Sequence, residues 1–80
     1  MLNEEYTSSI DLLADTFTEA IAMEVEERIH YIELSRFEHD MPKNEEQRKI
    51  YLNALINAVK QRINDADVYI SDNCLFVEEL

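Results

Sequence analysis

Two residues with metal-binding chemistry, Glu27 and His30, lie three positions apart in the sequence. On a helix, this Glu-x-x-His spacing points a carboxylate and an imidazole in the same direction, as in carboxylate-bridged di-iron bundles. Such sites need a second pair and further glutamates, which a symmetric dimer could supply, with Glu24, Glu26 or Glu33 nearby. An acid-rich helix also produces this spacing by chance. A metal-binding helical bundle using Glu27 and His30 is therefore an alternative interpretation, and we expect no metal or other cofactor.

No residue pattern supports enzymatic catalysis. Nucleophilic catalysis would need Cys74 or a serine beside a base that a third group holds in place, and neither histidine is close to Cys74 in the sequence. A cysteine in a hydrophobic strand is more often a small buried residue than a reactive thiolate. Carboxylates are abundant, but no apolar surroundings single out one pair for acid–base chemistry. The absence of glycine also excludes phosphate-binding loops, so we expect a protein that is not an enzyme.

Cysteine usage and hydropathy favour a cytoplasmic protein. Cys74 is the single cysteine and has no partner for a disulfide, which is typical of a reducing compartment. Residues 1–7 lack the basic and apolar regions of a signal peptide. No apolar stretch approaches the roughly 18 residues that a membrane span needs.

The net charge of −11 is unevenly distributed: residues 1–40 carry −9, residues 41–64 carry +3, and residues 65–80 carry −5. A field of this sign repels nucleic acid and anionic membranes, because affinity for either depends on Lys and Arg side chains that neutralise phosphates. We therefore expect no direct binding to nucleic acid and no binding to membranes. The charge also exceeds the magnitude of about 2 to 8 that keeps a small domain soluble, which favours a functional role for it.

The leading interpretation is an acidic inhibitor or adaptor that binds a partner protein with a basic surface. Carboxylates imitate the charge of a phosphate backbone, so they could occupy and block the basic groove of a nucleic-acid-binding protein, with fast, electrostatically steered association. An anti-defence protein encoded by a phage or mobile element, of the nucleic-acid-mimic type, fits this interpretation. The residues expected to form this acidic face are Glu19, Glu26, Glu27, Glu33, Glu38 and Asp40.

The first predicted element is a long helix over residues 4–38. Asn3 is a suitable N-cap, two acids occupy the first turn, and no proline or glycine interrupts the segment. Apolar residues from Ile10 to Ile32 follow helical periodicity and form a broad core face. A second apolar line lies roughly opposite and consists of Leu12, Met23, Leu34 and Phe37.

That second apolar line predicts self-association. A helix with two apolar faces needs two neighbours, and a chain of 80 residues has a marginal core by itself. We therefore expect a homodimer whose interface contains the four residues of this line. A structural or assembly subunit that oligomerises through the line is a further alternative function.

The second predicted helix covers residues 45–66. Pro42 ends the preceding segment, and Met41 is displaced from the α region by the proline that follows it. Asn44 is the expected N-cap, with Gln47 three residues later in a capping-box pattern. The short loop predicts that this basic helix lies antiparallel to the acidic first helix.

The C-terminal segment changes character and predicts a β-hairpin over residues 68–77. Two runs of β-forming residues are separated by Ser71, Asp72 and Asn73, and the last two tolerate the positive φ values of a tight turn. A C-terminal helix or an extended tail is the competing interpretation. The expected fold is thus mainly α: an antiparallel two-helix hairpin followed by a small C-terminal β-hairpin, in a single small domain of residues 1–80 completed by dimerisation.

Overall fold

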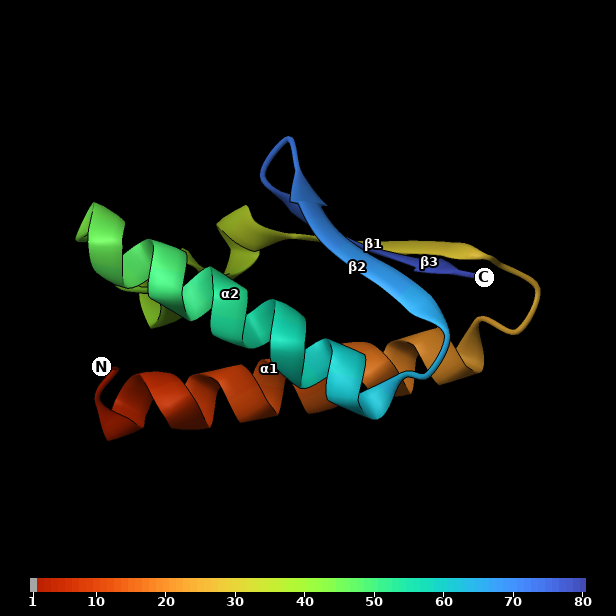
Figure 1. Ribbon diagram of the computed structural model, residues 1–80, viewed down its shortest axis with the longest axis horizontal. Coiled ribbons are helices and arrows are strands. Elements are labelled where there is room, and N and C mark those ends of the chain that lie inside the picture. Colours follow the sequence, from red (N-terminus) through yellow and green to blue (C-terminus); the bar gives the residue numbers. More distant parts are fainter. Residues whose placement is uncertain (1) are drawn as a thin grey trace.

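The computed structural model describes residues 2–80 and contains two long helices and a three-stranded sheet. The elements in chain order are α1 (Glu4–Met23), β1 (Ile29–Glu33), the 3-10 helix η1 (Leu34–Asp40), α2 (Glu45–Arg62), β2 (Ala66–Ser71) and β3 (Cys74–Glu79). The sheet is antiparallel, with strand order β1-β3-β2. Both helices lie on the same side of the sheet, so the protein has a helical layer and a sheet layer (Figure 1).

Helix α1 is shorter than the sequence predicts. It begins as expected, with the Asn3 side chain accepting a hydrogen bond from the Tyr6 N–H, but it ends at Met23 and not at residue 38. The last turn contains no basic residue, and the next residue is Glu24. Acids at a helix C-terminus are unfavourable because they lie beside the negative end of the helix dipole.

The segment after α1 forms the strand β1, which the sequence analysis did not predict. Side chains alternate along it, with His30 and Ile32 directed toward the helices, and Ile29 and Tyr31 exposed on the other face. β-Branched and aromatic residues favour a strand at this position. Apolar residues in so short a run fit helical and strand periodicity equally well, which explains the wrong prediction.

Because β1 brings the chain back across the molecule, α1 and α2 run in the same overall direction (Figure 1). Early residues of the two helices contact each other, since the Ser9 hydroxyl lies 2.7 Å from the Tyr51 hydroxyl. Later residues also meet, since the Arg62 Nε donates to Asp15 at 2.6 Å. Packing of two helices against each other is confirmed. The antiparallel direction expected from a short loop is wrong, since the connection contains a strand as well as η1.

Local signals around α2 and the C-terminal hairpin are confirmed. The Asn44 side chain caps α2 by accepting from the N–H groups of Glu46 and Gln47, although the helix ends at Arg62 and not at residue 66. Strands β2 and β3 form the predicted hairpin. Asp72 and Asn73 occupy its two-residue turn with φ values of 51° and 58°.

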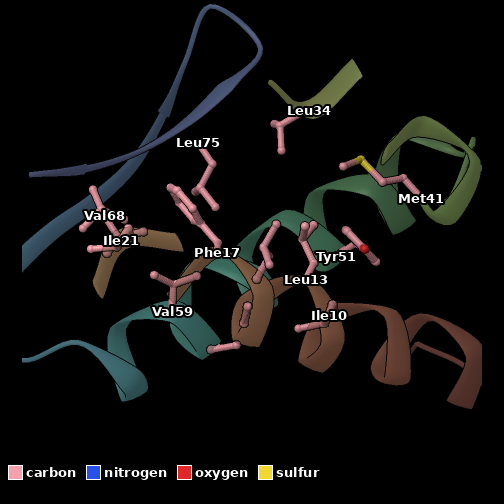
Figure 2. Close-up of a cluster of buried hydrophobic side chains, with 14 residues drawn as sticks. Ile10, Leu13, Phe17, Ile21, Leu34, Met41, Tyr51, Val59, Val68 and Leu75 are labelled. Atoms are coloured by element: carbon pink, nitrogen blue, oxygen red, sulfur yellow. The ribbon is translucent and has the colours of Figure 1, made fainter. Parts of the chain in front are cut away.

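The core lies between the helical layer and the sheet, and Figure 2 shows side chains from both layers meeting there. Its residues from α1 are Ile10, Leu13, Ala14, Phe17 and Ile21. Its residues from η1, α2 and the sheet include Leu34, Tyr51, Leu55, Val59, Val68, Leu75 and Val77. Among residues 2–80, no helix is both long and apolar enough to cross a membrane.

Candidate protein-binding surface

The six acids predicted to form one face are all exposed, but they do not share a helix. Glu19 lies on α1, Glu26 and Glu27 lie in the loop between α1 and β1, and Glu33 ends β1. Glu38 and Asp40 lie on η1, at the far end of β1 from that loop. A single acidic helix face is therefore wrong, because the predicted helix is interrupted at Met23.

Two of these six acids have a basic partner. Glu38 accepts two hydrogen bonds from the Arg48 guanidinium, at 2.8 and 2.6 Å, and these bonds hold the pKa of Glu38 below its ordinary value. Glu33 lies 3.7 Å from the Nε atom of Arg36. Their charges are partly neutralised, so they contribute less to attraction of a basic partner.

A denser group of acids lies at one end of the sheet, where the α1–β1 loop, the start of β2 and the end of β3 meet (Figure 1). We call this group the acidic end. It holds seven of the 18 acids and one of the seven bases. Its acids are Glu24, Glu26, Glu27, Asp65, Asp67, Glu78 and Glu79, and its base is Arg28. Register places Asp67 opposite Glu78, and the Glu79 N–H donates to the Arg28 carbonyl at 2.8 Å.

His30 joins the acidic end to the core. The residue is 2% exposed, and its Nδ1–H donates to the Glu24 carboxylate at 3.0 Å. Its Nε2 lies 3.7 Å from a Glu79 carboxylate oxygen, which is too long for a hydrogen bond, and it has no other hydrogen-bond partner among the described residues. His30 therefore links the end of α1 to β1 and holds the ends of the loop between them together.

Exposed apolar side chains border the acidic end. Met23 and Val25 are 85% and 86% exposed, and with Ile29 and Tyr31 they line an open hollow of about 680 Å³. The same hollow is lined by Glu24, Glu26, Glu27 and His30. Large apolar side chains in a contiguous exposed patch commonly mark interaction sites. The hollow thus combines negative charge with apolar contact area.

The predicted apolar interface line is not continuous. Leu34 is completely buried in the core, and Phe37 packs against the core. Leu12 and Phe37 line a small hollow between α1 and η1, while Met23 is the last residue of α1. These four residues therefore do not form one exposed surface through which two chains could pair. The homodimer itself stays a prediction.

The metal-binding alternative also loses its geometric basis. Glu27 lies in a loop and His30 lies in β1, so the helical spacing that would align them does not exist. Within residues 2–80, no group of three or more His, Cys, Asp or Glu side chains is arranged to hold a metal ion. His30 is buried because its side chain points from β1 toward the helices, and there it forms a hydrogen bond with Glu24.

Sequence reasoning located only part of this surface. Glu26 and Glu27 were predicted, but the sheet end contributes Asp67, Glu78 and Glu79, which were not. The available signal was the β-branched and aromatic composition of residues 29–32, which favours a strand. Composition does not reveal the partner strand or its register.

Comparisons of the chain with protein-family models, with curated proteins and with solved structures found no match. A functional proposal must therefore come from the surface itself. Its two distinctive properties are the acidic end and the exposed apolar side chains beside it.

Proposed function

We propose that the protein binds a basic surface of a partner protein and acts there as an inhibitor or adaptor. The observation that carries the proposal is the acidic end, where seven carboxylates and one arginine lie beside exposed apolar side chains. Carboxylates attract and orient a basic partner during encounter, while the apolar side chains add contact area that excludes water. Neither the carboxylates nor the exposed apolar side chains alone distinguish a binding surface from an ordinary solvent-exposed surface. Their occurrence at the same place supports a binding surface.

The basic surface is most simply one that normally binds nucleic acid. Such surfaces carry Lys and Arg side chains at the spacing of phosphates, and their affinity depends on releasing counterions. A compact protein with a concentrated negative field can replace the phosphates and exclude nucleic acid. This is the mode of action of nucleic-acid mimics, including those that phages and mobile elements direct against host defence.

The geometry separates the predicted acids into two sets. Glu26 and Glu27 lie in the acidic end, next to the exposed Met23 and Val25. Glu19 and Asp40 lie elsewhere, on α1 and η1. We expect only the first pair to contact the partner. Charge reversal of either pair changes the net charge equally, so the two double variants form a matched set.

The test is capture of basic proteins from a heparin-purified cell extract. The immobilised parent protein, the E26K/E27K variant and the E19K/D40K variant are incubated with this fraction at low salt. Bound proteins are then eluted with duplex DNA and identified by mass spectrometry. We expect the parent and E19K/D40K to retain the same nucleic-acid-binding protein, and E26K/E27K to retain much less of it.

Three results would contradict the proposal. The first is no retained protein at about 50 mM salt, where the Debye length is still above 10 Å and attraction between charges is strong. The second is equal retention by both double variants, which would show a dependence on net charge alone. The third is a retained protein that duplex DNA does not release, because a mimic and nucleic acid must compete for one surface.

A further inference from the structure

Strand β1 is an edge of the sheet, and the backbone groups of three of its five residues face outward. The Arg28 carbonyl accepts from the Glu79 N–H at 2.8 Å, and the Asn73 carbonyl accepts from the Leu34 N–H at 3.0 Å. Hydrogen-bonded pairs alternate along an antiparallel ladder, so these two pairs fix the pattern between β1 and β3. The residues whose N–H and C=O groups point away from β3 are Ile29, Tyr31 and Glu33.

These outward backbone groups have no partner within residues 2–80, where no turn or loop hydrogen bond reaches them. Hollows run along the whole strand: the 680 Å³ hollow is lined by residues from Ile29 to Tyr31, and a second of about 200 Å³ is lined by Tyr31, Ile32, Glu33 and Arg36. An uncovered edge strand presents a template on which another strand can pair.

The outer face of the sheet, on the side away from the helices, carries an aromatic row. Tyr31, Phe76 and Tyr69 lie opposite one another on the three strands, with ring centroids 5.9 and 5.4 Å apart. The neighbouring rows contain Glu33 on one side, and Glu78 with Asp67 on the other. None of the three strands contains a lysine or an arginine.

The two edges of the sheet differ in charge. Beside β2, a hollow is lined by Lys49 and Lys60 of α2. Beside β1, the larger hollow is lined by Glu24, Glu26 and Glu27, and the smaller one by Glu33 and its partner Arg36, so this edge keeps an excess of acids. A cationic strand is therefore repelled from the β2 edge and attracted to the β1 edge.

We propose that an extended basic segment of the partner pairs with β1 as a fourth strand, in antiparallel orientation. This inference rests on the proposed function and specifies how the basic partner is recognised. Main-chain hydrogen bonds to the outward groups of β1 supply affinity, and alternate side chains supply specificity, as in other cases of strand addition. Charge complementarity selects this occupant over a second copy of the chain, which would bring a further charge of −11 to the same edge.

The register defines the partner's sequence pattern. Every second side chain of the added strand lies on the outer face, directly beside Ile29, Tyr31 or Glu33. An arginine beside Tyr31 stacks on the ring, and an arginine or lysine beside Glu33 pairs with its carboxylate. The expected segment therefore has basic residues at alternating positions. The intervening residues lie on the helix side of the sheet.

The test uses a capped peptide in which arginine and threonine alternate, long enough to span β1. Two isomeric derivatives carry N-methyl groups, one on every arginine and the other on every threonine. In antiparallel pairing, the arginine N–H groups face β1, because these residues lie opposite Tyr31 and its outward neighbours. We expect the N-methylarginine peptide to bind at least about tenfold more weakly than the parent peptide, and the N-methylthreonine peptide to bind like the parent.

Two protein variants locate the peptide. Tyr31→Ala removes the ring beside the added strand, and we expect about three- to tenfold weaker binding. Tyr69→Ala removes the same side chain from β2, three strand spacings or about 14 Å from the added strand, so binding should not change. Both tyrosines are exposed, and far-UV circular dichroism verifies that each variant is folded.

Several outcomes would overturn strand addition at β1. Equal binding of the two N-methyl isomers would show that main-chain pairing is absent, and equal losses in the two tyrosine variants would place the peptide across the sheet face. No binding of the parent peptide at low salt would overturn strand addition. The proposed function would not be affected by this result, because capture of basic proteins tests it separately. A dimer in sedimentation equilibrium that Tyr31→Ala dissociates would show that a second copy occupies this edge.

Discussion

Leu34 provides the clearest test of the fold, because the sequence and the structure place it in different environments. A continuous helix over residues 4–38 would put Leu34 and Leu12 on the same exposed line. In the structure, Leu34 is 0% exposed and Leu12 is 70% exposed. Replacing each by alanine removes the same three carbon atoms. The two substitutions should therefore differ only through burial.

The expected losses follow from that burial. At about 0.8 kcal/mol per buried CH₂, Leu34→Ala loses roughly 2.4 kcal/mol of transfer free energy. An unfilled cavity raises the total to about 3 to 4 kcal/mol. Leu12→Ala should change the free energy of unfolding by less than about 0.5 kcal/mol. A protein of 80 residues is stable by roughly 4 to 12 kcal/mol, so the first loss is a large fraction of the whole.

Urea denaturation followed by far-UV circular dichroism measures both losses. If Leu34→Ala does not fold, Leu34→Met gives a milder change of below about 1.5 kcal/mol and keeps the comparison measurable. Equal losses for Leu34→Ala and Leu12→Ala, or a loss below about 1 kcal/mol for Leu34→Ala, would refute the position of η1 in the core.

Three further expectations concern single contacts. Because Arg48 lowers the pKa of Glu38, this pair stabilises the fold above the ordinary glutamate pKa and not in acid. Arg48→Ala should therefore lower the melting temperature slightly at pH 7. The difference in melting temperature from the parent should vanish as the pH falls below about 4.5. Asn73→Gly should raise the free energy of unfolding by about 0.5 kcal/mol, since glycine suits its φ of 58°. Tyr51→Phe removes the bond to Ser9 and should cost about 0.5 to 1.5 kcal/mol in urea denaturation.

Elements with signals inside their own segments were predictable from the sequence. Asn44 caps α2 and Pro42 separates it from η1, while Asp72 and Asn73 define the hairpin turn. Each of these signals depends on the backbone preferences of one or two residues. The start of α2 and the register of the C-terminal hairpin follow from them.

Strand β1 could not be predicted in the same way, because its stability comes from pairing with β3 near the other end of the chain. No proline or glycine marks the boundary between Met23 and Ile29, and Ile29 and Ile32 also fit the helical periodicity. Assigning these residues to a continuous helix led to two further errors. It placed Leu34 on an exposed apolar line, and it aligned Glu27 with His30 on one helix face.

The candidate surface was predictable in charge but not in position. Glu26 and Glu27 belong to it, yet Glu78 and Asp67 join them only through the sheet register. Residues that meet through non-local strand pairing carry no common spacing in the sequence. The negative character of the chain indicated a basic partner, and only the fold shows which acids lie together.

The most direct test of the proposed function is the salt dependence of association with the captured partner, measured by stopped-flow fluorescence. For the parent protein and E19K/D40K, the association rate should fall steeply as salt increases from about 50 to 300 mM, because screening weakens steering. E26K/E27K should associate more slowly at low salt and show a shallower dependence. Association that does not depend on salt, or equal slopes for the two double variants, would contradict binding through the acidic end.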